Sequence, residues 1–330
     1  MDYASRFHVL GFSGRISVSQ IFSGRPICAE TLALLRLHLE PAIEPAVARQ
    51  VFDAFERPSE IFASRPDMLS QWMSKAVAHR LCQPVSVAVA RAIRATIQWA
   101  SRPGCVLLTW LDAAYPAVLR ELSDAPVVLY AQGELGVLSR PAVTIVGARD
   151  ATAAGERLAF QLARQLALAK WTVVSGLAVG IDASAHRGAL AAAAQTGCAQ
   201  TVAVMATAPD RIYPAQHRAL AAGIVQKGGL LLTEFALGTS TTAHHFPQRN
   251  RLVAALGRAT VVVQARARSG SLITARLANE LGREVFAMPG PANHPLSAGC
   301  HELIRQGAGL LEGVDDLWQA FGLSALSKQC

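Results

Sequence analysis

From residue 105 onward, short runs of consecutive apolar residues alternate with longer amphipathic segments. Apolar runs of four or five residues are typical of strands buried on both faces, whereas apolar residues that recur every three or four positions are typical of helices. Strands joined by single helices form parallel sheets, so the pattern predicts an α/β fold with a doubly wound, mostly parallel sheet. The predicted strands lie at 105–109, 127–130, 142–146, 171–174, 201–205, 230–233, 261–264 and 285–288, with helices after Thr152, around Asp182, and near 215–226, 249–256, 272–281 and 300–306.

Residues 29–104 follow a different pattern, in which amphipathic segments are separated by prolines. Proline is tolerated between helices and at helix starts, so this part is predicted to be a small all-α domain. Residues 1–28 show no clear periodicity and are expected to be poorly ordered, and Ser101–Gly104 is interpreted as a linker. A DNA-binding helical hairpin would need glycines at its turn, whereas the turn at 40–45 holds two glutamates and two prolines. A packing or partner-docking role is therefore favoured over direct DNA binding by these helices.

Glycine turns follow the predicted strands at 142–146 and 171–174, with Gly147 in the first turn and Gly176 and Gly180 in the second. The ends of parallel strands meet at one edge of a sheet, where helix N-termini present free amides and the positive end of the helix dipole. We therefore expect an anion-binding edge. Neither a GxGxxG fingerprint nor a phosphate loop ending in GK[ST] is present, and no ribose-binding acid follows the first turn, so no dinucleotide or other cofactor is predicted.

Later strand ends add further candidates for this edge. Arg149 can reach across it, although a lone arginine after a strand is more often a solvated charge. Arginines begin the helix near 249–256, and the turn at 269–271 offers hydroxyls and amides that suit a phosphate or a sugar. The candidate anion-binding residues are Gly147, Arg149, Ser175, Gly176, Gly180, Arg249, Asn250, Arg251, Ser269, Gly270, Ser271 and Thr274.

Asp182 and His186 lie four residues apart on one predicted helix, which leaves two interpretations open. They could form an acid–base pair, or they could be a capping carboxylate and a buried histidine, which we favour. His244 and His245 lack a further ligand at a suitable spacing, so no metal ion is expected. The six cysteines form no CxxC pair and indicate separate reduced thiols.

Composition and charge change this picture little. The chain has 330 residues, 52% of them hydrophobic and 16% charged, which is enough to bury a large core. The net charge of +8 is spread along the chain, so it supports a polyanionic partner only weakly. No signal peptide is recognised, and the uncharged segment 188–209 is interpreted as helix, turn and strand rather than a membrane span. A cytoplasmic protein is expected.

Short motifs occur in a fixed order along the second part of the chain: GAR at 147–149, SGLAVGIDASAH at 175–186, YP at 213–214, TEF at 233–235, FPQRNR at 246–251, SGSLITA at 269–275 and EVFAMPG at 284–290. In this order and spacing they resemble the DprA/Smf family of DNA-processing proteins over about residues 105–312. The resemblance implies an extended Rossmann-like domain at 105–313 that binds and protects single-stranded DNA, forms a homodimer, and loads RecA during natural transformation. It also implies that the protein is not an enzyme and that residues 29–104 form a SAM-like domain.

The chain departs from the family pattern at several positions. The family usually has serine at Ala148, glutamate at Gln264 and asparagine at His217 and His301, which affects the fine geometry of the expected site. Residues 314–330 are too few for the winged-helix domain of many relatives, so a short tail is expected there.

Two alternative functions stay open. One is a nucleotide or nucleoside-monophosphate hydrolase of the lysine-decarboxylase-like Rossmann group, which also uses glycine turns and arginine at this edge. The other is an adaptor that holds RecA without contacting DNA. The hydrolase is disfavoured because no paired acidic motif is poised for glycosidic cleavage.

Overall fold

The computed structural model describes residues 28–323, which divide into two compact units. One unit contains the described residues up to Ala131 together with Glu234–Gly238, and the other contains residues 132–233 and the described residues from Thr239 onward. The start of the chain expected to be poorly ordered, residues 1–28, lies outside the described residues except for Cys28.

The N-terminal unit begins with helices, as the proline-separated pattern predicts. Proline opens α3, α4 and α5, and the hydroxyls of Ser74 and Ser86 cap α6 and α7. The amphipathic segment at 68–81, which looks continuous in the sequence, is divided between α5 and α6 because Ser74 starts a new helix. The elements are α2 (Ala29–Leu39), α3 (Pro45–Asp53), α4 (Pro58–Ile61), α5 (Pro66–Leu69), α6 (Lys75–Leu81), α7 (Val87–Ala100), β1 (Cys105–Thr109), the 3₁₀ helix η2 (Ala117–Glu121) and β2 (Val128–Gly133).

One hydrophobic core joins these helices to strands β1 and β2. Leu34 and Leu81 from the helices lie in the same buried cluster as Leu107 of β1 and Tyr130 of β2. Because the strands share this core, the compact unit extends to Ala131, whereas the sequence places a domain boundary at 104.

The second unit is built on seven parallel strands in the order β6-β5-β4-β3-β7-β8-β9. The predicted α/β fold is confirmed. Their bounds are β3 (Ala142–Val146), β4 (Thr172–Ser175), β5 (Thr201–Val204), β6 (Leu230–Thr233), β7 (Ala259–Val262), β8 (Glu284–Ala287) and β9 (Gly309–Leu310).

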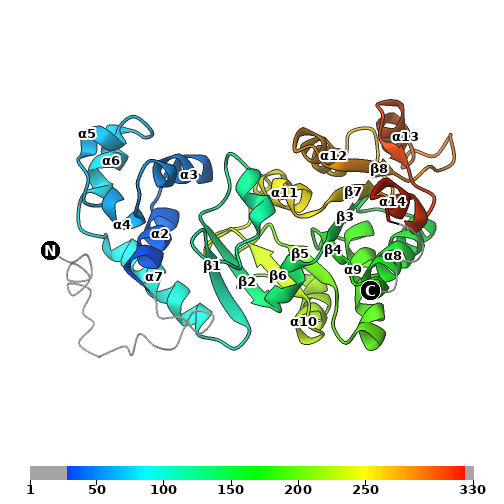
Figure 1. Cartoon of the computed structure of the whole chain (residues 1–330), viewed down its shortest axis with the longest axis horizontal. Helices are drawn as coiled ribbons and strands as arrows, with labels where there is room; N and C mark the ends of the chain where they lie inside the picture. Colours follow the sequence, from blue (N-terminus) through cyan, green and yellow to red (C-terminus); the bar gives the residue numbers. More distant parts are fainter. Residues whose placement is uncertain (1–27, 324–330) are drawn as a thin grey trace. The chain divides into compact units, whose positions relative to one another are not determined.

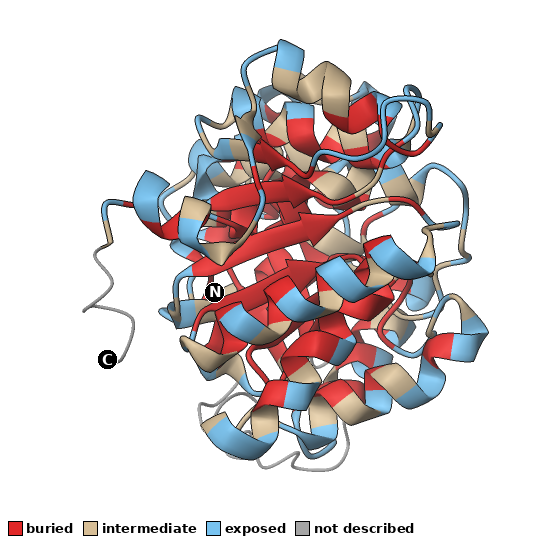
Figure 2. Cartoon of the chain, turned by 90° about the vertical axis from the view of Figure 1, so that its right-hand side faces the viewer, coloured by how far each residue is buried: buried red, intermediate tan, exposed pale blue. Residues whose placement is uncertain are grey.

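Helices cover both faces of these strands, with α8, α9 and α10 on one side and α11 and α12 on the other (Figure 1). The strands are buried between helices whose outer surfaces are exposed (Figure 2). The bounds are η3 (Leu135–Ser139), α8 (Ala153–Leu168), α9 (Ile181–Thr196), η4 (Ala215–His217), α10 (Arg218–Gln226), α11 (His245–Leu256), α12 (Gly270–Glu280), α13 (Ala298–Arg305) and α14 (Val314–Ala320).

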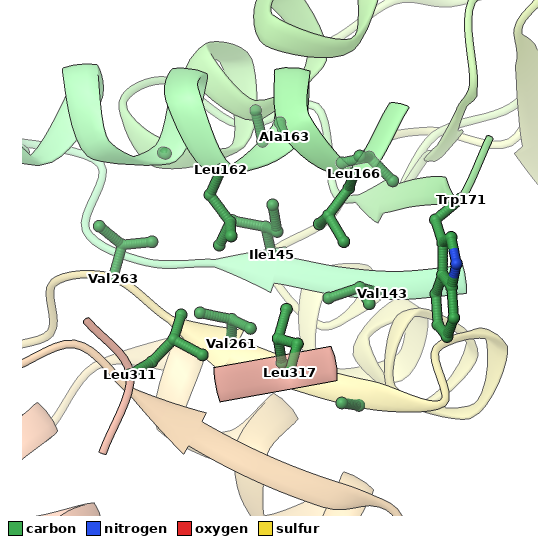
Figure 3. Close-up of a cluster of buried hydrophobic side chains, with 14 of the residues drawn as sticks. Val143, Ile145, Leu162, Ala163, Leu166, Trp171, Val261, Val263, Leu311 and Leu317 are labelled. Carbon is green, nitrogen blue, oxygen red and sulfur yellow. The ribbon is translucent and has the colours of Figure 1, made fainter. Parts of the chain in front are cut away.

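The core of this unit lies between α8 and the central strands. Leu162 and Leu166 of α8 lie over Val143 and Ile145 of β3, and Leu317 of α14 lies on the other side of the same cluster (Figure 3). Thr152 caps α8, as predicted, by accepting a hydrogen bond from the Gly155 amide at 3.1 Å.

The expected short tail begins with a packed helix. In the residues just after α14, the Phe321 ring stacks on Trp171 with centroids 4.9 Å apart, so this segment belongs to the core of the unit. Residues 324–330 of the tail lie outside the described part of the chain.

The strand order reverses at β3 and β7. From β3 the chain adds β4, β5 and β6 on one side, and then returns to place β7 on the other side of β3. The loops that leave β3 and β7 therefore diverge and open a crevice at the carboxyl ends of the strands, where ligands bind in sheets of this type.

Candidate functional site

A groove of about 650 Å³ lies at the carboxyl ends of β3 and β7. The turn after β3, the start of α11 and the start of α12 form its walls. We call this the switch-point groove, and its principal lining residues are Gly147, Arg149, Asp150, Asp182, Tyr213, Phe246, Arg249, Asn250, Arg266, Ser269, Gly270, Ser271 and Thr274.

Arg149 is exposed and lies beside an aromatic pair. Its guanidinium carbon is 5.3 Å from the centre of the Phe246 ring, and Tyr213 meets that ring edge-on with centroids 5.5 Å apart. A smaller hollow of about 190 Å³ shares these three residues with the switch-point groove. A cation and two rings at an open surface can contact phosphates and stack on bases without reading a sequence.

The start of α12 supplies hydroxyl and amide groups to the same groove. The hydroxyls of Ser269 and Ser271 lie 2.6 Å apart, and the Asn250 side-chain amide donates to the carbonyl of Gly270 at 3.4 Å. Thr274 lies one turn further along the helix and is buried. An α-helix N-terminus with nearby hydroxyls favours an anion, as the sequence led us to expect.

Arg249, in contrast to Arg149, is buried beneath the groove. Its guanidinium donates to the carbonyl oxygens of Gly176 and Val204. Burial lowers the pKa of Arg249 to about 10, which leaves it charged at neutral pH, and Asp182 opposes this shift. A Cβ atom on Gly176 would lie 2.5 Å from the guanidinium, so glycine at 176 makes room for Arg249.

The turn after β4 is occupied by internal hydrogen bonds. The amides of Gly176 and Ala178 donate to the Asp182 carboxylate at 3.1 and 3.3 Å, and the Ser175 hydroxyl donates to the Ile145 carbonyl at 2.7 Å. Burial raises the pKa of Asp182, while the nearby charge of Arg249 and these amides lower it. The groups expected to contact a phosphate are thus engaged within the protein.

Two further candidates do not line the groove. Gly180 has a φ of 77°, a conformation that favours glycine, and an added Cβ would lie 2.3 Å from the Ala148 carbonyl oxygen. Arg251 is buried on α11 and is not among the groove-lining residues. The structure therefore brings Gly147, Arg149, Arg249, Asn250, Ser269, Gly270, Ser271 and Thr274 to the groove, Gly176 to the smaller hollow, and Ser175, Gly180 and Arg251 to neither.

Asp182 and His186 have separate hydrogen-bond partners. The Nδ1 atom of His186 lies 2.8 Å from the Thr201 hydroxyl, whereas the Asp182 carboxylate accepts hydrogen bonds from backbone amides of the turn before α9. His186 is fully buried, and burial lowers its pKa to about 3. This arrangement agrees with the second interpretation, a capping carboxylate and a buried histidine.

The groove contains groups that sequence reasoning did not select as site residues. Phe246 and Tyr213 form the aromatic wall, and Arg266 pairs with Asp150 across the two diverging loops. The signal for Phe246 was its place three residues before Arg249 in the FPQRNR motif, and Arg266 follows a predicted strand end. The hydrogen bond and charge of Arg266 lower the pKa of Asp150.

Residues 28–323 contain neither a candidate metal site nor a helix that could span a membrane. In that range no group of three or more histidine, cysteine or acidic side chains is placed to hold a metal ion. Every helix among these described residues is too short or too polar to cross a membrane.

Comparisons with known proteins cover most of the second unit. Residues 106–322 match the family model for DNA recombination-mediator protein A. The chain is 38% identical over 235 residues to the Smf protein of Escherichia coli, a match that covers 71% of this chain but 62% of that protein. It is 41% identical over 211 residues to the DNA processing protein DprA of Streptococcus pneumoniae, covering 64% of this chain and 72% of that one.

Solved structures show the same fold. The X-ray structure of DprA from Streptococcus pneumoniae superposes with a TM-score of 0.74 at 32% identity, covering 89% of this chain and 98% of that one. A structure of DNA processing protein A from Helicobacter pylori, which describes a single-stranded DNA binding mode of that protein, has a TM-score of 0.58 at 30% identity and covers 65% of this chain and 95% of that one. The chain therefore belongs to the DprA/Smf family of DNA-processing proteins, the DNA recombination mediators.

Proposed function

We propose that this chain binds single-stranded DNA in the switch-point groove and delivers the strand to a RecA-type recombinase. The observation that carries the proposal is the exposed guanidinium of Arg149 beside the Phe246 and Tyr213 rings, at the point where the strand order reverses. A phosphate backbone would contact Arg149 and the start of α12, while bases stack on the rings. The DNA-binding mode described for the Helicobacter pylori relative supports this proposal.

The buried candidates support the groove from below in this proposal. The turns that shape it are held by Arg249, Ser175, Gly176 and Gly180. The direct contacts come from Arg149, Asn250, Ser269 and Gly270, and the buried Ser271 and Thr274 support the start of α12. The site therefore combines the exposed Arg149 and the Asp150-paired Arg266 with hydroxyls and amides, above a buried polar layer.

Replacing Arg149 by alanine is expected to weaken binding of a labelled oligonucleotide about tenfold, because a charge-assisted phosphate contact is lost. The slope of log affinity against log salt concentration should become shallower by about 0.7. Fluorescence anisotropy at several salt concentrations measures both quantities. The control is Arg157→Ala, an equal loss of charge on the exposed side of α8. Equal affinities and slopes for Arg149→Ala and Arg157→Ala would refute the proposed site.

The ion pair between Arg266 and Asp150 predicts an opposite effect. Asp150→Asn should release Arg266 toward phosphates and remove a negative charge from the groove, so single-stranded DNA should bind about two- to fivefold more tightly at low salt. The gain should shrink as salt is raised. Glu156→Gln, which removes the same charge from α8, is the control. Weaker binding by Asp150→Asn would show that Asp150 organises the groove rather than competing for Arg266.

No observation favours the nucleotide hydrolase. The two carboxylates that line the groove are engaged, Asp150 with Arg266 and Asp182 with the amides of Gly176 and Ala178. Incubation with AMP followed by chromatography for free adenine tests this alternative, since release of the base would establish it.

Delivery to a recombinase and homodimer formation are parts of the same proposal. The family description as a recombination mediator supports the first, and both are implied by the motifs that this chain shares with its relatives. Assembly of RecA on DNA covered by a single-strand-binding protein tests delivery, and light scattering at several concentrations tests the dimer. RecA binding with no oligonucleotide binding would instead favour the adaptor.

A further inference from the structure

One residue outside the groove holds both ends of the turn that carries Arg149. The backbone carbonyl of Gln264, just after β7, accepts the Ala148 amide at 2.7 Å. The side-chain carbonyl of Gln264 accepts the Thr152 amide at 3.0 Å, and its side-chain NH₂ donates to the Thr152 hydroxyl at 3.0 Å. Gln264 thus makes three hydrogen bonds to this turn, one to Ala148 before Arg149 and two to Thr152 after it.

The fit around the Gln264 amide is close. The Thr152 hydroxyl also accepts the Gly155 amide at 3.1 Å, so the Gln264 bonds join the cap of α8. A Cβ atom on Gly155 would lie 2.4 Å from the Gln264 side-chain carbon, so glycine at 155 leaves the space that the amide fills. Gln264 uses a donor and an acceptor at once, which an apolar side chain cannot reproduce.

We infer that Gln264 is a positioning residue for single-stranded DNA binding and acts through Arg149. Gln264 is not among the residues that line the groove, whereas Arg149 lines both hollows. The Ala148 carbonyl accepts the Ile181 amide at 3.2 Å, so the start of the turn is also fixed to α9. These hydrogen bonds fix the short exposed turn and keep the Arg149 guanidinium over Phe246. Because the turn is already ordered, binding of a phosphate to Arg149 costs little backbone conformational entropy. This inference rests on the proposed function.

A double-mutant cycle separates the inference from the proposal on which it rests. The proteins are the full chain, Arg149→Ala, Gln264→Met and the double variant, and the measurement is oligonucleotide affinity across salt. Gln264→Met is expected to weaken binding about fivefold and to make the salt slope shallower in the full chain. In the Arg149→Ala background it should have no further effect on either quantity.

Each outcome of the cycle has a distinct meaning. If Arg149→Ala leaves binding unchanged, the proposed groove is wrong whatever Gln264 does. If Arg149→Ala weakens binding but Gln264→Met has no effect, or has the same effect in both backgrounds, the positioning role is overturned.

Two further variants distinguish a positioning role of Gln264 from a general loss of folding stability. Thr172→Val removes another buried hydroxyl, which donates to the Val137 carbonyl at 2.9 Å in the same unit. It should lower the melting temperature and leave affinity and salt slope unchanged. Gln264→Glu keeps two acceptors for the Thr152 amide and hydroxyl, so it should retain more of the Arg149-dependent binding than Gln264→Met. Equal losses from the glutamate and methionine variants would count against the inference.

Discussion

Arg249→Met is expected to destabilise the second unit by about 3–5 kcal/mol, since it removes the cation from a buried charged cluster. The Gly176 and Val204 carbonyls would lose their donor, and the buried Asp182 carboxylate would lose the nearby positive charge. Methionine fills similar space without replacing the donors. Urea denaturation, with amide exchange in β4 and β5 as the local readout, measures the change in free energy of unfolding.

Two further variants show whether burial of the charge causes this loss. Arg268→Met changes an exposed arginine in the loop before α12 and should alter stability by no more than about 0.5 kcal/mol. Asp182→Asn combined with Arg249→Met should recover part of the loss, because the uncompensated carboxylate is gone. A loss below about 1 kcal/mol for Arg249→Met alone would mean that Arg249 is not the support described above.

Much of the fold could be predicted from local patterns. The strands at 105–109, 142–146 and 230–233 have the predicted bounds, because uninterrupted apolar runs between turn residues have few other stable conformations. Strand β9 was missed because its two residues, Gly309 and Leu310, are too few to form a periodic pattern. The compact N-terminal unit extends to Ala131 because β1 and β2 share a core with its helices, and no local pattern in the sequence reports a shared core.

The sequence predicts that the site lies at the carboxyl ends of the strands, but not which side chains are exposed there and which are buried. Sequence alone places Arg149 and Arg249 alike, each beside a strand end or helix start. Tertiary packing separates them, since one guanidinium lies exposed beside Phe246 and the other donates to carbonyls of two different strand ends. The bonds from Gln264 to Thr152 span 112 positions in the chain, and no local pattern reports such a pair.

Acid is expected to destabilise the second unit through His186. The Thr201 hydroxyl donates to the Val173 carbonyl at 2.8 Å, so it must accept from Nδ1–H of His186, 2.8 Å away. The proton therefore sits on Nδ1, and protonation would place a second proton on Nε2. That atom is buried and has no hydrogen-bond partner within the described part of the chain.

The direction of the pH effect follows from the two pKa values of His186. Burial, with smaller contributions from the nearby His217, Arg249 and Arg187, lowers the folded-state pKa of His186 to about 3, against 6.5 for an unhindered histidine. Between pH 3 and pH 6.5 His186 binds the additional proton in the unfolded chain but not in the folded one. The contribution of neutral His186 to the free energy of unfolding is therefore complete above pH 6.5. It falls as the pH decreases toward 3, by up to about 1.4 kcal/mol per pH unit.

Urea denaturation between pH 7.5 and 4.5 tests this linkage. His186→Gln should lower stability at neutral pH but make its pH dependence shallower, since glutamine has no proton to gain. Thr201→Val should lower stability at every pH and keep the steep dependence, because Nε2 stays buried and without an acceptor. The difference between the wild-type and His186→Gln curves isolates this histidine from groups that titrate in both proteins, including the buried His38 of the other unit. Parallel curves for the wild type and His186→Gln would show that His186 accepts a proton in the folded state as readily as in the unfolded one.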